Sequence, residues 1–193
     1  MTMSLGSWEV NVSVGSMPEK VASAVADLQL DGAEYTPIAY LGSQVVNGIN
    51  HAVLAEQLLI TGKDTKNVVV LIFNEKGMEC NLVNIERVVE SYDGMGGTVV
   101  DVKTEIPEDA QKAFDNVLAT FTGSNVKPFA LLATQVVKGI NYVFAAELDL
   151  VTKEPVKKVA IVVINDLLKT VSFTDILKSD LEVSLGKPLG EWP

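Results

Sequence analysis

The pattern of apolar and polar residues changes from a strand period to a helical period twice along the chain. Residues 8–14 carry an apolar side chain at every second position, which predicts a strand. Helical spacing follows, with Ser16 and Glu19 as a predicted capping box and Asp31-Gly32 as the stop signal. The second copy predicts a strand over 98–103 and a helix from Pro107. The apolar positions expected on the inner faces of the two helices are Val21, Ala24, Val25, Leu28, Ala110, Phe114, Val117 and Phe121.

Each predicted helix is followed by four β segments joined by short links. The expected segments cover residues 38–46, 49–61, 67–74 and 80–90, and then 129–137, 140–152, 158–165 and 171–177. Short links between consecutive strands require hairpins, so the sheets are expected to be antiparallel. An antiparallel sheet must bury one face, and each copy has one amphipathic helix to cover it. The pattern therefore predicts an α+β fold, with one helix packed on a four- to five-stranded antiparallel sheet in each of two domains.

An internal repeat sets the domain organisation. Residues 44–85 and 135–176 align without a gap at a shift of 91 positions, and 14 of the 42 aligned residues are identical. The segment Ser91–Gly97 contains three glycines and is the expected boundary. We therefore predict domains over residues 1–93 and 94–193. Because the connection is short, the domains should stay close together, which would limit how two bulky partners fit side by side.

The composition narrows the classes of partner and of compartment. With 25 acidic and 15 basic residues the net charge is −10, and no basic cluster is present, so we expect neither nucleic-acid nor membrane binding. The longest apolar runs, 68–73 and 159–164, are six residues each, far below the roughly 20 that a membrane-spanning helix needs. Cys80 is the only cysteine, which excludes an intramolecular disulfide and favours a packing role for this side chain. The expected location is the cytoplasm, or outside the cell if a signal sequence has been removed.

The repeat is most similar at one predicted turn. Residues 44–51 read Gln-Val-Val-Asn-Gly-Ile-Asn-His and residues 135–142 read Gln-Val-Val-Lys-Gly-Ile-Asn-Tyr, and six of the identities fall within the first seven positions. Glycine at the turn permits a positive φ and close approach of another protein. The two valines offer apolar contact, and the glutamine can hydrogen-bond across an interface. The candidate binding residues are Gln44, Val45, Val46, Asn47, Gly48, Gln135, Val136, Val137, Lys138 and Gly139.

This turn resembles the first inhibitory loop of the cystatins, protein inhibitors of papain-like cysteine peptidases. The absence of disulfides is similar to the stefin branch of that family. The resemblance implies two tandem cystatin-like domains. It also implies a wedge of three segments that blocks the peptidase cleft: this loop, an N-terminal arm and a second hairpin. Leu5-Gly6 is similar to the arm, and Met95-Gly96-Gly97 is its counterpart in the second copy. The second hairpin lacks the usual proline and tryptophan, but Leu167 and Leu168 are apolar enough to replace them, which favours the second domain as the tighter binder.

The function expected from these residues is reversible inhibition of a papain-like cysteine peptidase. The alternative is a non-inhibitory module that binds another protein through its sheet or loops. We expect no enzyme activity, cofactor or metal, because no nucleophile elbow, phosphate loop or metal-ligand spacing is present. His51 is expected to pack or to lie at the surface, and the repeated Glu56 and Glu147 are expected on an outward sheet face.

Overall fold

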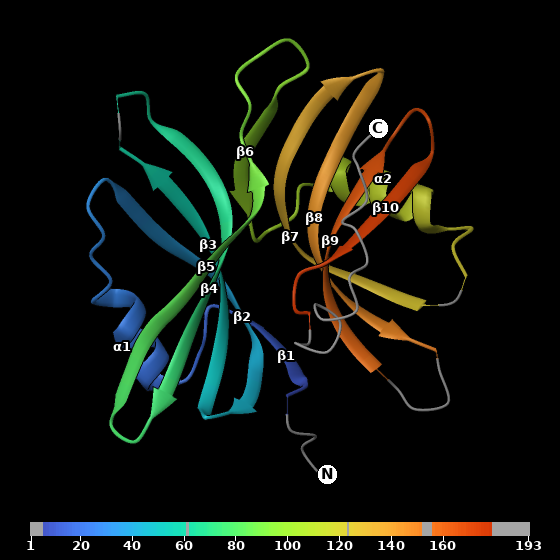
Figure 1. The fold of residues 1–193 in the computed structure, drawn as a ribbon. Helices are drawn as coiled ribbons and strands as arrows, with labels where there is room; N and C mark the ends of the chain where they lie inside the picture. The colour runs from blue at the N-terminus through green and yellow to red at the C-terminus, as the bar shows by residue number, and fades with distance from the viewer. Residues whose placement is uncertain (1–5, 61, 123, 152–155, 179–193) are drawn as a thin grey trace.

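The computed structural model describes residues 6–60, 62–122, 124–151 and 156–178 (Figure 1). The first half contains β1 (Trp8–Val14), α1 (Glu19–Ala26), β2 (Ala33–Val46), β3 (Gly48–Leu59), β4 (Thr65–Lys76) and β5 (Glu79–Glu90). The second half contains β6 (Thr98–Lys103), α2 (Glu108–Leu118), β7 (Ser124–Val137), β8 (Gly139–Leu150), β9 (Val156–Asn165) and β10 (Thr170–Asp175). The predicted strands are all present, and their ends differ from the prediction by a few residues.

The strands form two antiparallel sheets. One has the order β1-β2-β3-β4-β5 and the other has the order β10-β9-β8-β7-β6. The sheets lie face to face, with α1 on the outer side of the first and α2 on the outer side of the second (Figure 1). Strand β1 contacts β9 of the other sheet, and β6 contacts β4 in the same reciprocal way.

A hydrophobic core shared by both halves fills the space between the sheets. Alternate residues of each central strand point into it, and its fully buried members include Leu41, Leu54, Val68, Ala130, Leu132 and Val159. The intervening residues point outward under a helix. Val53, Leu71 and Phe73 pack against α1, and Phe144, Val162 and Ile164 pack against α2. Each central strand is therefore buried on both faces.

The predicted fold class was wrong. Strands make up 61% of the structure and helices 11%, so two five-stranded sheets dominate instead of an α+β arrangement of tandem cystatin-like units. The prediction assumed that a helix covers one face of each sheet and that water covers the other. The runs Ala52–Ala55 and Val68–Leu71 are buried without interruption, which a half-solvated strand does not allow. The second face is covered by the partner sheet.

The predicted capping box was also wrong. Helix α1 begins at Glu19, and its N-cap is Pro18 without a side-chain cap. The Ser16 hydroxyl hydrogen-bonds to the Ser13 hydroxyl at 2.6 Å. Helix α2 likewise begins after Pro107. Both helices therefore begin directly after a proline, whose fixed φ is compatible with the start of a helix.

The shared core predicts that the two halves unfold together. Leu132→Ala removes a fully buried side chain between the sheets and should lower the free energy of unfolding by about 2–5 kcal/mol. Chemical denaturation followed by circular dichroism should show one transition that moves as a whole. The matched control is Leu168→Ala at an exposed turn, with an expected change within about 0.5 kcal/mol. Two separate transitions, only one of which moves, would contradict a common core.

Candidate functional site

The repeated turns close the hairpins β2–β3 and β7–β8. Val46 pairs with Gly48 in the first hairpin, and Val137 pairs with Gly139 in the second. Gly48 has φ +104° and Gly139 has φ +87°. A Cβ atom on Gly48 would lie 2.5 Å from the Glu75 carbonyl oxygen, and one on Gly139 would lie 2.6 Å from Asp166 Oδ1. Glycine is therefore required by the backbone angle and by the neighbouring hairpin.

Three segments meet at each of these turns. Gly6 donates its N–H to the Val45 carbonyl at 3.2 Å, which places the segment that precedes β1 against the turn. The β4–β5 turn lies on the other side, because Ile49 pairs with Glu75. We call the set Gly6, 45–48 and 75–78 the first tip. The equivalent set in the second half, Gly96, 136–139 and 166–169, together with Met95 beside Gly96, is the second tip.

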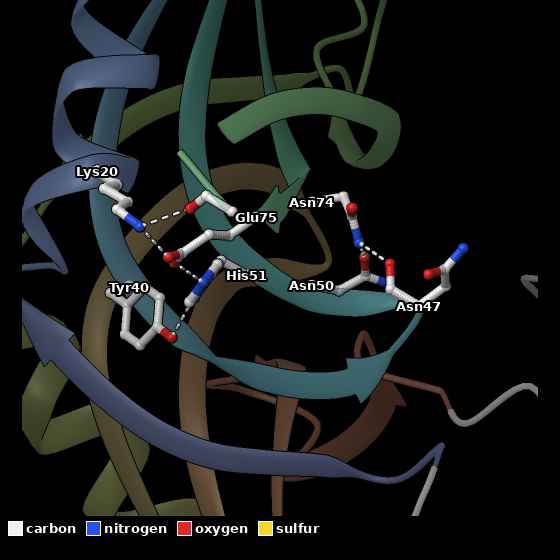
Figure 2. A network of polar contacts seen from close by, with 8 residues as sticks. Lys20, Tyr40, Asn47, Asn50, His51, Asn74 and Glu75 are labelled. Atoms are coloured by element: carbon white, nitrogen blue, oxygen red, sulfur yellow. Dashed lines mark hydrogen bonds and ion pairs between the residues drawn. The ribbon is translucent and has the colours of Figure 1, made fainter. Parts of the chain in front are cut away.

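A chain of side-chain amides joins the three segments of the first tip. Gln44 Nε2 donates to the Gly6 carbonyl at 2.9 Å. Asn50 Nδ2 donates to Gln44 Oε1 at 3.2 Å, and Asn74 Nδ2 donates to Asn50 Oδ1 at 2.8 Å. Figure 2 shows Asn74 beside Asn50 and the turn residue Asn47, whose carbonyl also accepts from Asn74 at 3.4 Å. We call this chain the amide relay.

The second tip repeats the amide relay residue for residue. Gln135 Nε2 donates to the Gly96 carbonyl at 2.8 Å. Asn141 Nδ2 donates to Gln135 Oε1 at 2.8 Å, and Asn165 Nδ2 donates to Asn141 Oδ1 at 2.8 Å. Asn165 Nδ2 also reaches the Lys138 carbonyl at 3.2 Å. Since the same bonds recur in both halves, the repeated Gln and Asn residues are explained by a common clamp on the tip.

The second tip has further bonds that hold its second turn. Asn165 Oδ1 accepts from the backbone N–H groups of Leu167 at 3.1 Å and Leu168 at 2.7 Å. Asp166 Oδ1 accepts from the Ile140 N–H at 2.7 Å, which ties the two hairpins together. Lys169 has a positive φ of 55°, which lets the chain return into β10. The backbone around the two leucines is therefore fixed by contacts within the molecule.

The first tip has a polar cluster in place of these bonds. His51 is buried, with Nδ1 2.9 Å from the Tyr40 hydroxyl and Nε2 3.1 Å from Glu75 Oε2. Lys20 of α1 donates to Glu75 Oε1 at 2.6 Å and to the Gly77 carbonyl at 2.9 Å. Figure 2 shows this link from helix to turn. The hydrogen bond from Lys20 is the main reason that the pKa of Glu75 lies below its ordinary value. In the second half Tyr142 takes the place of His51 and stacks on Phe144.

Apolar exposure distinguishes the tips. Val136 is 71% exposed and Leu167 is 59% exposed. The exposed apolar side chains at the second tip are Met95, Val136, Val137, Leu167 and Leu168. At the first tip Val45 and Val46 are half-buried, and the exposed apolar residues in and beside it are Ile49 and Met78. Among the described residues, which do not include Leu5, the second tip therefore presents the larger apolar surface.

The structure brings most of the predicted site residues together. Gly6 and residues 44–48 meet at the first tip, while residues 135–139, Leu167 and Leu168 meet at the second. Leu5 lies outside the described residues. Gln44 is only 4% exposed and its amide is used inside the molecule.

Two features of the repeat were not predicted from the sequence. Asn74 and Asn165 complete the relays and were visible as one of the identical pairs. Lys66 and Lys157, another identical pair, each form an ion pair of 3.0 Å with the repeated Glu56 and Glu147.

Other kinds of site have little support among the described residues. The described residues include no group of three or more His, Cys, Asp or Glu side chains arranged to hold a metal ion. Burial raises the pKa of the Cys80 thiol, which keeps it protonated and a poor nucleophile. Neither helix in the described ranges is long and apolar enough to cross a membrane.

No family model, curated protein or solved structure matches the chain. The resemblance to the cystatins therefore rests on the residues of the tips alone.

The amide relay should stabilise the tip locally. Asn141→Ala removes the central amide and leaves Gln135 and Asn165 each without one partner, which should cost about 1–3 kcal/mol. Hydrogen exchange measured by mass spectrometry should become faster over residues 135–141. Asn125→Ala, at an exposed position on β7, is the matched control and should change neither quantity. Unchanged exchange in the Asn141 variant would argue against a clamp.

The Lys20–Glu75 pair should stabilise the first tip in a pH-dependent way. The pKa of Glu75 is lowered in the folded protein, so its contribution is present above the ordinary carboxyl pKa and is lost as pH falls through the folded value. Lys20→Met should destabilise the protein at pH 7 and have a smaller effect near pH 3. Thermal unfolding across this range tests it. Lys112→Met, which removes an exposed pair with Glu108 on α2, should show little effect at either pH.

Proposed function

We propose that the tips are preformed protein-binding surfaces, and that the second tip blocks the cleft of a papain-like cysteine peptidase reversibly. The observation that carries the proposal is the group of exposed apolar side chains, Met95, Val136, Val137, Leu167 and Leu168, held on three clamped segments. The similarity of both turns to the inhibitory loop of the cystatins supports this class of target.

Preorganisation supports binding by this surface. Ordering a mobile loop when a complex forms costs roughly 0.5–1.5 kcal/mol for each side chain that loses its freedom. At the second tip the backbone of residues 137–139 is paired in a hairpin, and Asn165 fixes both the Lys138 carbonyl and the Leu167 N–H. Little further ordering is needed on binding, so more of the interaction energy appears as affinity.

Apolar burial supplies the attraction. Full burial of a valine or leucine side chain contributes roughly 1.5–3 kcal/mol. Val136, Leu167 and Leu168 are each more than half exposed in the free protein and have this area available. A cleft that encloses them would gain several kcal/mol, enough to offset part of the cost of association.

The shape of the second tip also explains why a peptidase would not cleave it. A peptidase cleaves a substrate segment that lies extended along its cleft. The tip offers a tight turn instead, in which Val137 pairs with Gly139 and the Ile140 N–H is held by Asp166. Extending this segment would break the hairpin and the amide relay. The turn therefore fills the cleft without presenting a scissile bond.

Val136→Glu should abolish tight inhibition while leaving the fold intact. The side chain is exposed in the free protein, but in a cleft the new carboxylate would lose its hydration at a cost of several kcal/mol. Because about 1.4 kcal/mol is a tenfold change, the inhibition constant against papain should rise by at least about 100-fold. Gly139→Glu is a poorer test, since its positive φ and crowded Cβ position would disturb the turn itself.

The matched control is Val151→Glu, an exposed position just beyond the other end of β8. It should inhibit like the unmodified protein. Equal inhibition by both variants would remove the second tip as the contact surface. If the unmodified protein binds no papain-type enzyme, the non-inhibitory interaction module becomes the better description.

A further inference from the structure

We infer that this chain holds two partner molecules at once, one at each end of the double-sheet body. The inference rests on the proposed function and concerns how the two tips are placed. They lie at opposite ends of the molecule and face away from each other: the hairpin β2–β3 is at the bottom of Figure 1 and the hairpin β7–β8 is at the top.

The path of β5 places the second tip at the far end of the first sheet. Strand β5 starts beside the first tip, where Lys76 pairs with Glu79, and ends where Glu90 pairs with Asn67. Its 12 residues span roughly 40 Å at about 3.3 Å per residue. The chain then reaches Gly96, whose carbonyl accepts the hydrogen bond from Gln135. The length of a strand therefore separates the two tips.

The contact between Trp8 and Lys178 also places the two tips at opposite ends, now seen from the second sheet. Trp8 pairs with Gln44 beside the first tip, and its Nε1 donates to the Lys178 carbonyl at 3.2 Å. Lys178 follows β10, which starts opposite Asn165 at the second tip and ends opposite Ala160. The first tip therefore lies at the far end of the second sheet.

The shared core fixes this arrangement. The two sheets are held by fully buried side chains such as Leu54 and Leu132, so they cannot swing about the short connection. A globular partner of about 200 residues has a radius of gyration of about 16 Å. Partners that approach from opposite ends along an axis of roughly 40 Å would not overlap. The expectation that a short linker would crowd two partners does not hold for this geometry, because they do not sit side by side.

The two positions should bind independently. The two tips share no residue by their definition, and the body between them is a packed core. Occupation of one tip therefore gives the other no new contact and no steric conflict. Affinities can still differ, since the first tip has the polar cluster of His51 and Glu75 whereas the second has Leu167 and Leu168.

The test measures the mass of complexes with papain whose catalytic thiol has been carboxymethylated, so that nothing is cleaved. Size-exclusion chromatography with light scattering should give one chain with two papain molecules when papain is in excess. Val45→Glu and Val136→Glu change equivalent positions, one at each tip. Each single variant should form a one-to-one complex, and the double variant should form none. Thermal unfolding by circular dichroism checks that each variant is folded.

Calorimetry on the single variants then gives the affinity of each tip alone. In the intact chain these two values should reproduce the full titration to within about threefold, because the tips do not influence each other. If both single variants bind but the intact chain never exceeds one papain, the tips exclude each other and the inference is overturned while the proposed function stands. The inference also fails, and the proposed function again stands, if Val136→Glu removes all binding and Val45→Glu removes none. If the intact chain binds no papain, the proposed function itself fails.

Discussion

Burial of both faces of each sheet is the constraint on which the rest of this structure depends. The inner faces share one core, whose members such as Leu54 and Leu132 come from both halves of the chain. The outer faces are covered by two short helices, of 8 and 11 residues. If the inner face of each sheet were in water, the two sheets could move relative to each other. Here each sheet completes the core of the other, so they are held together. This mutual burial turns a repeat in the sequence into a single body.

A rigid body allows its ends to be specialised. The tips are built from turns and from the segment that precedes the first strand of each half, and such segments move freely in many proteins. Here the strands place the three segments of each tip side by side, and the amide relay of that tip joins them. The relay uses neutral side chains, so it does not depend on pH or salt as an ion-pair clamp would. Around the relay the two tips differ, with a charged cluster at one end and exposed leucines at the other.

Much of the local structure could be predicted from the sequence, because strands and helices leave periodic patterns and hairpins follow from short links. The turn residues were also accessible through the repeat. The layer arrangement was not predicted, although a signal was present. Six consecutive apolar residues at 68–73 exceed what a strand with one face in water would carry, and they indicate a strand that is buried on both faces. The polar contacts also divide into those whose residues the sequence indicates and those that only the structure reveals. Asn74 and Asn165 were identifiable as identical positions of the repeat, but their partners are known only once the strand register is known. The contact of His51 with Glu75 joins residues 24 positions apart on neighbouring strands, a separation that no local motif encodes. The bond between Trp8 and Lys178 spans 170 positions and follows only from how the sheets pack.

The reciprocal contacts between the sheets, β1 with β9 and β6 with β4, are those of a two-fold axis. Strand β6 is the counterpart of β1, and β9 is the counterpart of β4, so each contact is the image of the other. Symmetric dimers of identical subunits show this relation, because a patch on one subunit meets the equivalent patch on the next. The chain is therefore organised as a dimer whose two subunits are covalently joined. In a covalently linked pair, each half can change its sequence independently while the interface between them is kept. In a dimer of identical copies, every substitution appears in both subunits.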